Sequence, residues 1–511
     1  MTDMLNYCII TLVVFKTKCR GRQVSRIVVS ILCLGLAVSR ALSADFEIVI
    51  NNGRVIDPET NLDAIRHVGI RNGSILAISE TPLVGDEEID ASNMVVSPGF
   101  IDRNTYSLGD ELFRLRAADG VTTTFNFEEG AIDVAQAYES LAGSALINYG
   151  FSSSEGAARM KVAFDGDIDV RNGIAYLPDS LSQAKVSEID AHSMTPEEFL
   201  DVLDIVEVGL KAGAPAVGMG PEYFPASTNN EVLEVFKLAA KYGRSVQIHV
   251  RSWDPLIDHG AMYEVIAGSV VSGAPIHISH LNSVSAEYID IYLGFLTRVT
   301  ALGLPITTEC YPYTAGKTEI QSTMFDSWRD WSDEQFDRYQ WAATGERLTR
   351  TTFEEYREEG GWVIIHWMQE EWIEKCVSHP MTQIASDGGW DDGDAHPRVS
   401  GSHTRFLGRY VRDKQLLDLP LAIRKISLLP ALSLQQAIPQ MARKGRLQVG
   451  MDADIVVFDA STVIDKATYE SPLSVPDGIK VVMVNGVVIL QDGQFVENVW
   501  PGESIRAAII E

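Results

Sequence analysis

Five residues have the chemistry of a metal-dependent hydrolase, and each stands at the end of an apolar run. They are Glu128, Glu129, His249, His280 and Asp387. Zinc binds imidazole nitrogens and carboxylate oxygens that converge from several elements, and a catalytic site leaves one position open for water. A nearby carboxylate can take a proton from that water and deliver it to a leaving group. Each residue alone also fits a helix cap or a hydrogen-bonded strand end, but the set together favours hydrolysis at a metal centre.

Such a site needs a scaffold that brings distant strand ends together. Residues 98–444 alternate short apolar runs, such as 216–220 and 245–250, with amphipathic helical stretches such as 231–240. Buried parallel strands separated by helices give this pattern. The length fits a (β/α)8 TIM barrel, whose active site lies at the carboxyl ends of its strands. We therefore predict an α/β protein with a TIM barrel over residues 98–444.

Both ends of the chain carry short strand patterns of another kind. Asn-Gly pairs at 52–53, 72–73 and 485–486 interrupt runs rich in valine and isoleucine, as they do in β-hairpins. Either end by itself has too few strands to bury a core. We predict one small β-sandwich domain that is assembled from both termini, residues 46–97 and 445–511.

The leader, residues 1–45, has the pattern of an export signal. Basic residues at 16–26 precede an apolar run at 27–38, and small residues follow up to Ala44. This order is typical of a signal peptide cut after Ala44, and the run is too short for a comfortable membrane span. An earlier apolar stretch at 8–15 leaves open an uncleaved anchor or a start codon assigned too far upstream. We predict export to the periplasm or the extracellular space, without stable membrane association after cleavage.

Composition narrows the possible partners. The chain of 511 residues is 46% hydrophobic and 22% charged, with a net charge of −28, which describes a globular protein. No basic stripe is available for a phosphate backbone, so we predict no nucleic-acid partner. The sequence does not specify an oligomeric state.

Cysteine usage is sparse outside the leader. Only Cys310 and Cys376 remain there. Two cysteines in a domain of this size are not a disulfide framework, and no Cys-x-x-Cys zinc pattern is present. We therefore predict that export is not accompanied by disulfide stapling.

Several segments are similar to one enzyme family. The chain resembles the N-acyl-D-amino-acid deacylase branch of the amidohydrolase superfamily, which includes D-aminoacylases and D-glutamate deacylases, over about residues 47–505. The matching segments are GVTT at 120–123, ALINYG at 145–150, HISH at 277–280, ECYPYTAG at 309–316, ASDG at 385–388, HPR at 396–398, LGRYVR at 407–412 and KGRLQVGMDADIVVFD at 444–459. The resemblance implies the TIM barrel and β-sandwich expected above.

The resemblance also implies one tightly held zinc ion with three protein ligands. His249 and His280 match two of them, and Glu128 matches the third, with Glu129 left open as an alternative. The first barrel strand departs from the family pattern, because Asn104 and Tyr106 stand where relatives carry the two histidines of a second, weaker metal. An amide and a neutral phenol are poor replacements for imidazole. We predict one zinc ion per chain.

The remaining roles follow from the same resemblance. Asp387 matches the general acid and base, Arg398 matches the arginine that binds the substrate α-carboxylate, and Tyr313 matches a tyrosine that helps to polarise the scissile carbonyl. A planar guanidinium suits a carboxylate through paired hydrogen bonds. His277 lies three positions before His280, so on one strand the two side chains would point to opposite faces. We predict that His277 faces the helices.

These roles describe a zinc-dependent hydrolase that cleaves the amide C–N bond of small N-acyl amino acids, in the D series. Two alternatives stay open. One is a different amidohydrolase chemistry on the same site, such as hydrolysis of cyclic amides or dipeptides. The other is a pseudoenzyme that binds an acylated amino acid without cleaving it, which the replacement of both histidines by Asn104 and Tyr106 would favour.

Overall fold

The computed structural model describes residues 12–19, 22–29, 45–164, 166–178, 180–251, 260–391 and 394–510. The chain divides into two compact units, Met1–Ala44 and Asp45–Glu511. The first contains an antiparallel hairpin of β1 (Leu12–Cys19) and β2 (Arg22–Val29). Most of the predicted apolar export segment, and the predicted cut after Ala44, lie outside the described residues. Within the described ranges, every helix is too short or too polar to cross a bilayer.

Eight parallel strands form a barrel in the second unit, which confirms the predicted fold class. Each strand pairs with its neighbours in parallel. The circle nearly closes between its first and last strands, where Thr105 bridges to Gly388 and the amide of Tyr106 donates to the Gly388 carbonyl. In spatial order the strands are β8 (Phe100–Asp102), β9 (Val121–Ala131), β10 (Asn148–Ser154), β13 (Ala216–Met219), β14 (Ser245–Ile248), β15 (Ile276–Ile278), β16 (Ile306–Cys310) and β20 (Thr382–Ile384).

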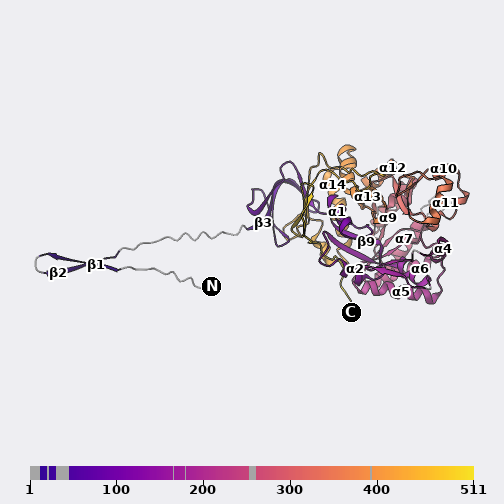
Figure 1. Cartoon of the computed structure of the whole chain (residues 1–511), viewed down its shortest axis with the longest axis horizontal. Coiled ribbons are helices and arrows are strands. Elements are labelled where there is room, and N and C mark those ends of the chain that lie inside the picture. Colours follow the sequence, from indigo (N-terminus) through magenta and orange to yellow (C-terminus); the bar gives the residue numbers. More distant parts are fainter. Residues whose placement is uncertain are drawn as a thin grey trace. The chain divides into compact units, whose positions relative to one another are not determined.

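Amphipathic helices cover the outside of the barrel (Figure 1). Helix α6 (Asn229–Lys241) shows how the sequence forms them, because Thr228 and Glu231 make a capping box at its start. Its buried face then packs toward the strands. The other main helices are α1 (Asp110–Ala118), α2 (Val134–Ser140), α3 (Glu155–Ala163), α4 (Gln183–Asp190), α5 (Pro196–Lys211), α7 (Gly260–Ser272), α9 (Ile289–Ala301), α12 (Glu370–Ser378), α13 (Arg398–Arg405), α14 (Leu419–Ile423) and α15 (Leu429–Leu434).

An insertion after β16 forms a small layer of its own. Strands β17 (Ala315–Glu319), β18 (Tyr339–Trp341) and β19 (Trp362–His366) make an antiparallel sheet. Helices α10 (Asp333–Phe336) and α11 (Arg350–Glu359) lie on the same stretch of chain. A separate aromatic cluster fills this layer, so it is stabilised independently of the barrel core.

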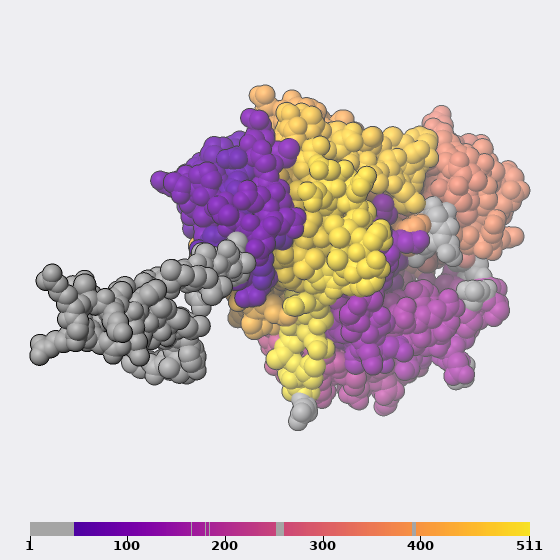
Figure 2. Space-filling view, turned by 60° about the vertical axis from the view of Figure 1, so that its left-hand side comes forward, coloured from indigo at the N-terminus to yellow at the C-terminus, as the bar shows by residue number. Residues whose placement is uncertain are grey.

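Strands from both ends of the chain share one nine-stranded sheet. β7 pairs with both β3 from the N-terminal side and β23 from the C-terminal side. Figure 2 shows the two segments, indigo to purple and yellow, packed against each other at the surface. The strands are β3 (Phe46–Asp57), β4 (Leu62–Arg71), β5 (Ser74–Ser79), β6 (Gly85–Asp90), β7 (Val95–Pro98), β23 (Ile455–Phe458), β24 (Ile479–Val484), β25 (Val487–Gln491) and β26 (Gln494–Phe495). They enclose an apolar core separate from that of the barrel.

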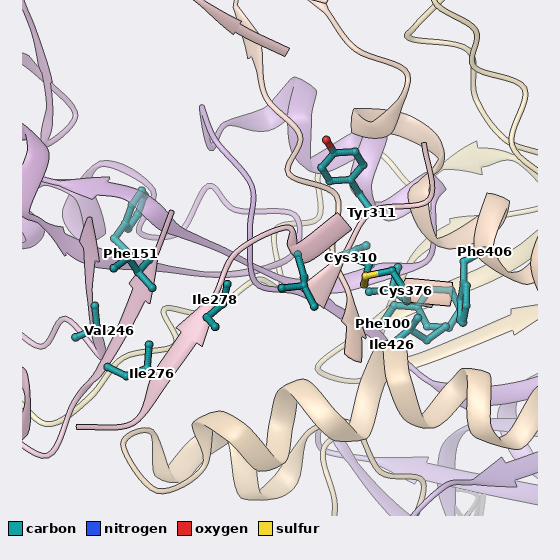
Figure 3. Packing of buried hydrophobic residues seen from close by; sticks show 14 of the residues in the cluster. Phe100, Phe151, Val246, Ile276, Ile278, Cys310, Tyr311, Cys376, Phe406 and Ile426 are labelled. Atoms are coloured by element: carbon teal, nitrogen blue, oxygen red, sulfur yellow. A yellow bond between two sulfur atoms is a disulfide. The ribbon is translucent and has the colours of Figure 1, made fainter. Parts of the chain in front are cut away.

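A disulfide joins the barrel to one of its helices (Figure 3). Cys310 at the end of β16 is bonded to Cys376 in α12, with a Cα–Cα distance of 6.2 Å. The prediction of no disulfide stapling is therefore wrong. Cysteine counting could not reveal this bond, because the two partners are 66 positions apart in the sequence and only the fold brings them together.

Candidate metal centre and active site

Three buried side chains from different strands converge on one point. Oε1 of Glu128 in β9 lies 3.1 Å from Nδ1 of His249, which follows β14, and 3.3 Å from Nε2 of His280, which follows β15. One ligand atom from each residue lies within 4.8 Å of the others. Glu129 is exposed and accepts a hydrogen bond from Asn126 instead. Of the two glutamates that the sequence left open, Glu128 is the one in the cluster.

The charges of this cluster are strongly coupled. Burial opposes ionisation of Glu128, but the two histidines outweigh burial and hold its pKa well below the usual range. Burial also opposes protonation of His280, yet Glu128 and Asp387 raise its pKa to about 9. For His249 burial prevails and lowers the pKa. Without a metal, His280 therefore holds a proton against Glu128 at neutral pH, and His249 is neutral.

Two site residues are oriented by backbone conformations that lie outside regular strand geometry. His280 has φ of 33° and Asp387 has φ of 51°, in the left-handed region that non-glycine residues rarely adopt. Such conformations persist where the surrounding structure holds them. For His280 the support is Ser283, whose Oγ lies 2.7 Å from Nδ1 and donates to the His280 carbonyl. Nδ1 is therefore the hydrogen-bonding nitrogen, and Nε2 faces the cluster.

The predicted acid and base is held by two side chains. Oδ1 of Asp387 accepts a hydrogen bond of 2.9 Å from the hydroxyl of Tyr106. Its Oδ2 lies 2.5 Å from a terminal nitrogen of Arg398, in a buried ion pair. Burial raises the pKa of Asp387, although Arg398, His280 and the Tyr106 hydrogen bond oppose that rise. Nε of Arg398 has no hydrogen-bond partner among the described residues, so a donor remains for a substrate.

Asn104, the other replaced position, also contacts the cluster. Its Nδ2 lies 2.8 Å from Oε2 of Glu128 and 2.8 Å from Oε1 of Glu309. Since both neighbours are carboxylate oxygens, the amide turns its NH2 group toward them.

Asp102, at the end of the first barrel strand, holds the segments that carry Tyr106 and Asp387. It was not identified from the sequence. Oδ1 of Asp102 accepts hydrogen bonds from the backbone amides of Asn104 and Ser386. Its Oδ2 lies 2.6 Å from the fully buried Arg116. Asp102 therefore joins the segments that carry Tyr106 and Asp387. The sequence feature that could have identified Asp102 was its position at the end of the first barrel strand.

The two tyrosines near the site, Tyr311 and Tyr313, have different partners in the structure. The hydroxyl of Tyr313 donates to Asp465, 3.1 Å away, whereas Tyr311 lies under the guanidinium of Arg398 at 4.8 Å and 6.4 Å from the His280 ring. The Tyr311 hydroxyl also points away from the apolar cluster (Figure 3). Tyr311 is therefore the tyrosine that contacts Arg398 and His280, and the role of Tyr313 in polarising the scissile carbonyl stays a prediction.

His277 faces the barrel interior and not the helices. Its Nε2 lies 3.0 Å from Glu309, which is bonded in turn to Asn104. Asn104 follows β8 and Glu309 belongs to β16, which are not neighbours in the sheet, so this contact runs through the interior. The prediction was wrong because β15 ends at Ile278 and His280 lies in a left-handed turn, where strand alternation no longer holds.

The donor set fits a zinc ion. Two imidazole nitrogens and one carboxylate oxygen are ligands that zinc prefers, and three protein ligands are typical of a catalytic site with an open position. Within the described ranges, Glu128, His249 and His280 are the one group of potential ligands that lie close enough together. These three residues would hold the metal.

Comparison with known proteins finds relatives that cover most of the chain. No family model matches the chain. It is 28% identical to D-aminoacylase from Alcaligenes xylosoxydans xylosoxydans over 488 residues, which cover 90% of this chain and 97% of that protein. It is 27% identical to N-acyl-D-glutamate deacylase from the same organism, covering 87% and 93%.

A solved structure extends the similarity to the fold. It is the N-acyl-D-glutamate deacylase from Bordetella bronchiseptica, crystallised with zinc and a phosphonate inhibitor that mimics the tetrahedral intermediate. The TM-score is 0.77 at 25% identity, over 90% of this chain and 100% of that one. The chain is therefore a homologue of D-aminoacylase and N-acyl-D-glutamate deacylase.

Proposed function

We propose that the protein is a zinc-dependent hydrolase that cleaves the amide bond of N-acyl-D-amino acids and releases a carboxylate and the free amino acid. The observation that carries the proposal is the convergence of Glu128, His249 and His280 beside a buried Asp387–Arg398 pair. A pseudoenzyme would have no physical reason to keep metal ligands, a proton-transfer group and a carboxylate-binding arginine together. The relatives named D-aminoacylase and N-acyl-D-glutamate deacylase support the substrate class.

Each residue of the site has its own role in the proposed reaction. Zinc held by the three ligands would supply Lewis-acid polarisation of the acyl carbonyl and a lower pKa for a water molecule. Asp387 takes a proton from the attacking water and passes it to the departing amine. Its pKa, raised by burial, favours the protonated form that the second transfer needs. Arg398 binds the α-carboxylate, a part of the substrate that does not react, and so orients the amide.

The direct test is a screen of N-acetyl-D- and N-acetyl-L-amino acids with added zinc, in which free amine is quantified. Amine release in the D series alone is the expected result. The matched variant is Asp387→Asn, which keeps the shape but cannot accept the proton. We expect it to lose turnover roughly 100- to 10,000-fold while its zinc content stays at the wild-type level.

The same screen separates the alternatives. Cyclic amides and dipeptides are included, and cleavage of these alone would replace the proposed substrate class. If N-acyl amino acids bind, by calorimetry, and no amine appears with any acylated compound, the chain is a binding protein and the proposal is wrong.

We also propose that the protein is exported. The disulfide between Cys310 and Cys376 supports this, because disulfides persist mainly in oxidising compartments. N-terminal sequencing of the mature protein tests it. A new terminus near Asp45 is expected, and a mature chain that keeps Met1 and remains in the cytoplasm would contradict export.

A further inference from the structure

The carboxylate of Glu128 has two differently used oxygens. Oε1 faces His249 and His280, at 3.1 and 3.3 Å. Oε2 accepts the amide of Asn104 at 2.8 Å. Glu128 is buried, so neither contact is weakened by exposure to bulk water. The asparagine therefore fixes the rotation of the carboxylate and leaves one oxygen for a metal.

The same NH2 group also reaches a second carboxylate. Nδ2 of Asn104 lies 2.8 Å from Oε1 of Glu309, which is fully buried. Two buried carboxylates this close to one point need a cation, a shared proton or a hydrogen-bond donor between them. The asparagine supplies the donor. Its Oδ1 has no hydrogen-bond partner in the described part of the chain, so its orientation is set by the two carboxylates.

The surroundings of Glu309 leave it no free ligand oxygen. Its Oε2 lies 3.0 Å from Nε2 of His277, and Nδ1 of His277 lies 2.7 Å from the hydroxyl of Thr307. The buried guanidinium of Arg103 lies in the same interior layer, bonded to Gln247 and interacting electrostatically with Glu309. The carboxylate and the imidazole that could build a second centre are thus engaged with each other and lie near a fixed positive charge.

We propose that Asn104 is a positioning residue that takes the place of a second cation: it links Glu128 to Glu309, restricts the centre to one metal and orients Glu128 for that metal. The inference rests on the proposed zinc site, and it does not depend on which substrate is cleaved. Asn104 is then more than the replacement of a lost metal ligand, because it is a functional part of a mononuclear centre.

The test compares Asn104→Ala and Asn104→Asp with a matched control, Asn148→Ala. Asn148 is another fully buried asparagine that bonds a carboxylate, that of Asp454, in the sheet away from the cluster. The readouts are zinc affinity by chelator competition, metal stoichiometry by mass spectrometry, the absorption spectrum of the cobalt-loaded protein, and thermal stability. These readouts do not require activity.

We expect wild type to bind one zinc ion. Asn104→Ala should weaken zinc binding about 10- to 100-fold, as loss of a hydrogen bond to a ligand does, and alter the cobalt spectrum. Asn104→Asp, which replaces the donor by a third carboxylate, should bind two ions. Asn148→Ala should lower only thermal stability.

Wild type with two zinc ions, or Asn104→Ala with wild-type zinc affinity and cobalt spectrum, would overturn the inference. If Asn104→Asp does not fold, the measurements on Asn104→Ala alone test the inference. If wild type binds one zinc tightly but releases no amine from any N-acyl amino acid, the proposed activity fails while the role of Asn104 is still decided by these measurements.

Discussion

The hydroxyl of Tyr106 donates a hydrogen bond of 2.9 Å to Oδ1 of Asp387. Tyr106 stands at a position where relatives were expected to carry a metal-binding histidine, and it contacts the proposed proton-transfer group instead. Together with Arg398 on the opposite oxygen, it holds the Asp387 carboxylate in one orientation. Both replaced positions of the first strand thus support a carboxylate of the site, since Asn104 does the same for Glu128.

Removal of this hydroxyl should slow the chemical step. A hydrogen bond to a charged group contributes about 1.5–3 kcal/mol, so we expect Tyr106→Phe to lower kcat roughly 10- to 100-fold, with little change in KM or zinc content. The control is Tyr138→Phe, which removes a buried hydroxyl that donates to the backbone carbonyl of Ile505 and accepts from the backbone amide of Phe151, away from the site. Steady-state kinetics that show equal effects for the two variants would mean that Tyr106 does not position Asp387.

Arg398 has two possible partners, Asp387 and the substrate carboxylate. Kinetics with two substrates can distinguish between these two roles. In the substrate-free structure it is paired with Asp387, yet its assigned role is to bind the substrate carboxylate. We expect Arg398→Lys to raise KM roughly tenfold or more for an N-acyl amino acid, because a lysine cannot form the bidentate contact. The corresponding N-acyl amino acid amide lacks the carboxylate and serves as control. A fall in kcat of equal size for both substrates would show that Arg398 acts only through Asp387.

Zinc uptake should depend on pH through His280. Its pKa of about 9 in the metal-free protein exceeds the ordinary value near 6.5, so zinc must displace a proton from Nε2 at neutral pH. Apparent affinity should therefore rise about tenfold per pH unit between pH 7 and 9 and level off above that range. Chelator competition at several pH values, corrected for the chelator's own protonation, measures it. A flat profile from pH 7 to 9 would contradict the assigned protonation.

The same shift predicts a stability profile for the metal-free protein. The folded-state pKa of His280 is raised, so its pairing with Glu128 contributes stability that is fully present below about pH 6.5. That contribution is lost as pH rises through the folded value of about 9. Zinc-loaded protein should lack this loss, which makes it the control in thermal unfolding at pH 6, 7.5 and 9.

The disulfide should add to stability. It closes a loop with a sequence separation of 66, for which a contribution of roughly 2–4 kcal/mol to the free energy of unfolding is usual. Cys376→Ser should lower the urea midpoint accordingly, and wild type under strong reductant should unfold at nearly the midpoint of the variant. An unchanged wild-type midpoint with reductant would show that Cys310 and Cys376 are not bonded.

The sequence predicted those parts of the site that depend on strand ends. His249 and His280 follow apolar runs that become β14 and β15, and a parallel barrel brings such ends together. The resemblance to the deacylase family, over most of the chain, indicated which polar residues belong to the site, including Asp387. Periodicity and chain length were sufficient for the barrel, because its strands are buried on both sides and separated by capped helices.

The parts that the sequence missed depend on local backbone geometry and on contacts across the barrel. Strand alternation misplaced His277 because the chain turns left-handed at His280. The contact of Tyr313 with Asp465, which is more than 150 positions away, could not be predicted from the local sequence. The direction of the Asn104 amide depended on Glu309, a residue to which the sequence assigned no role and which the barrel places close to Asn104.

We propose a single catalytic zinc centre that works without the two histidines of the first strand. Its test is the rate of amine release from an N-acetyl-D-amino acid as metal-free enzyme is titrated with zinc. We expect a linear rise that breaks at one equivalent per chain and stays level or falls beyond it. A rise that continues to two equivalents, or no amine at any zinc concentration, would show that the centre is not a single catalytic zinc.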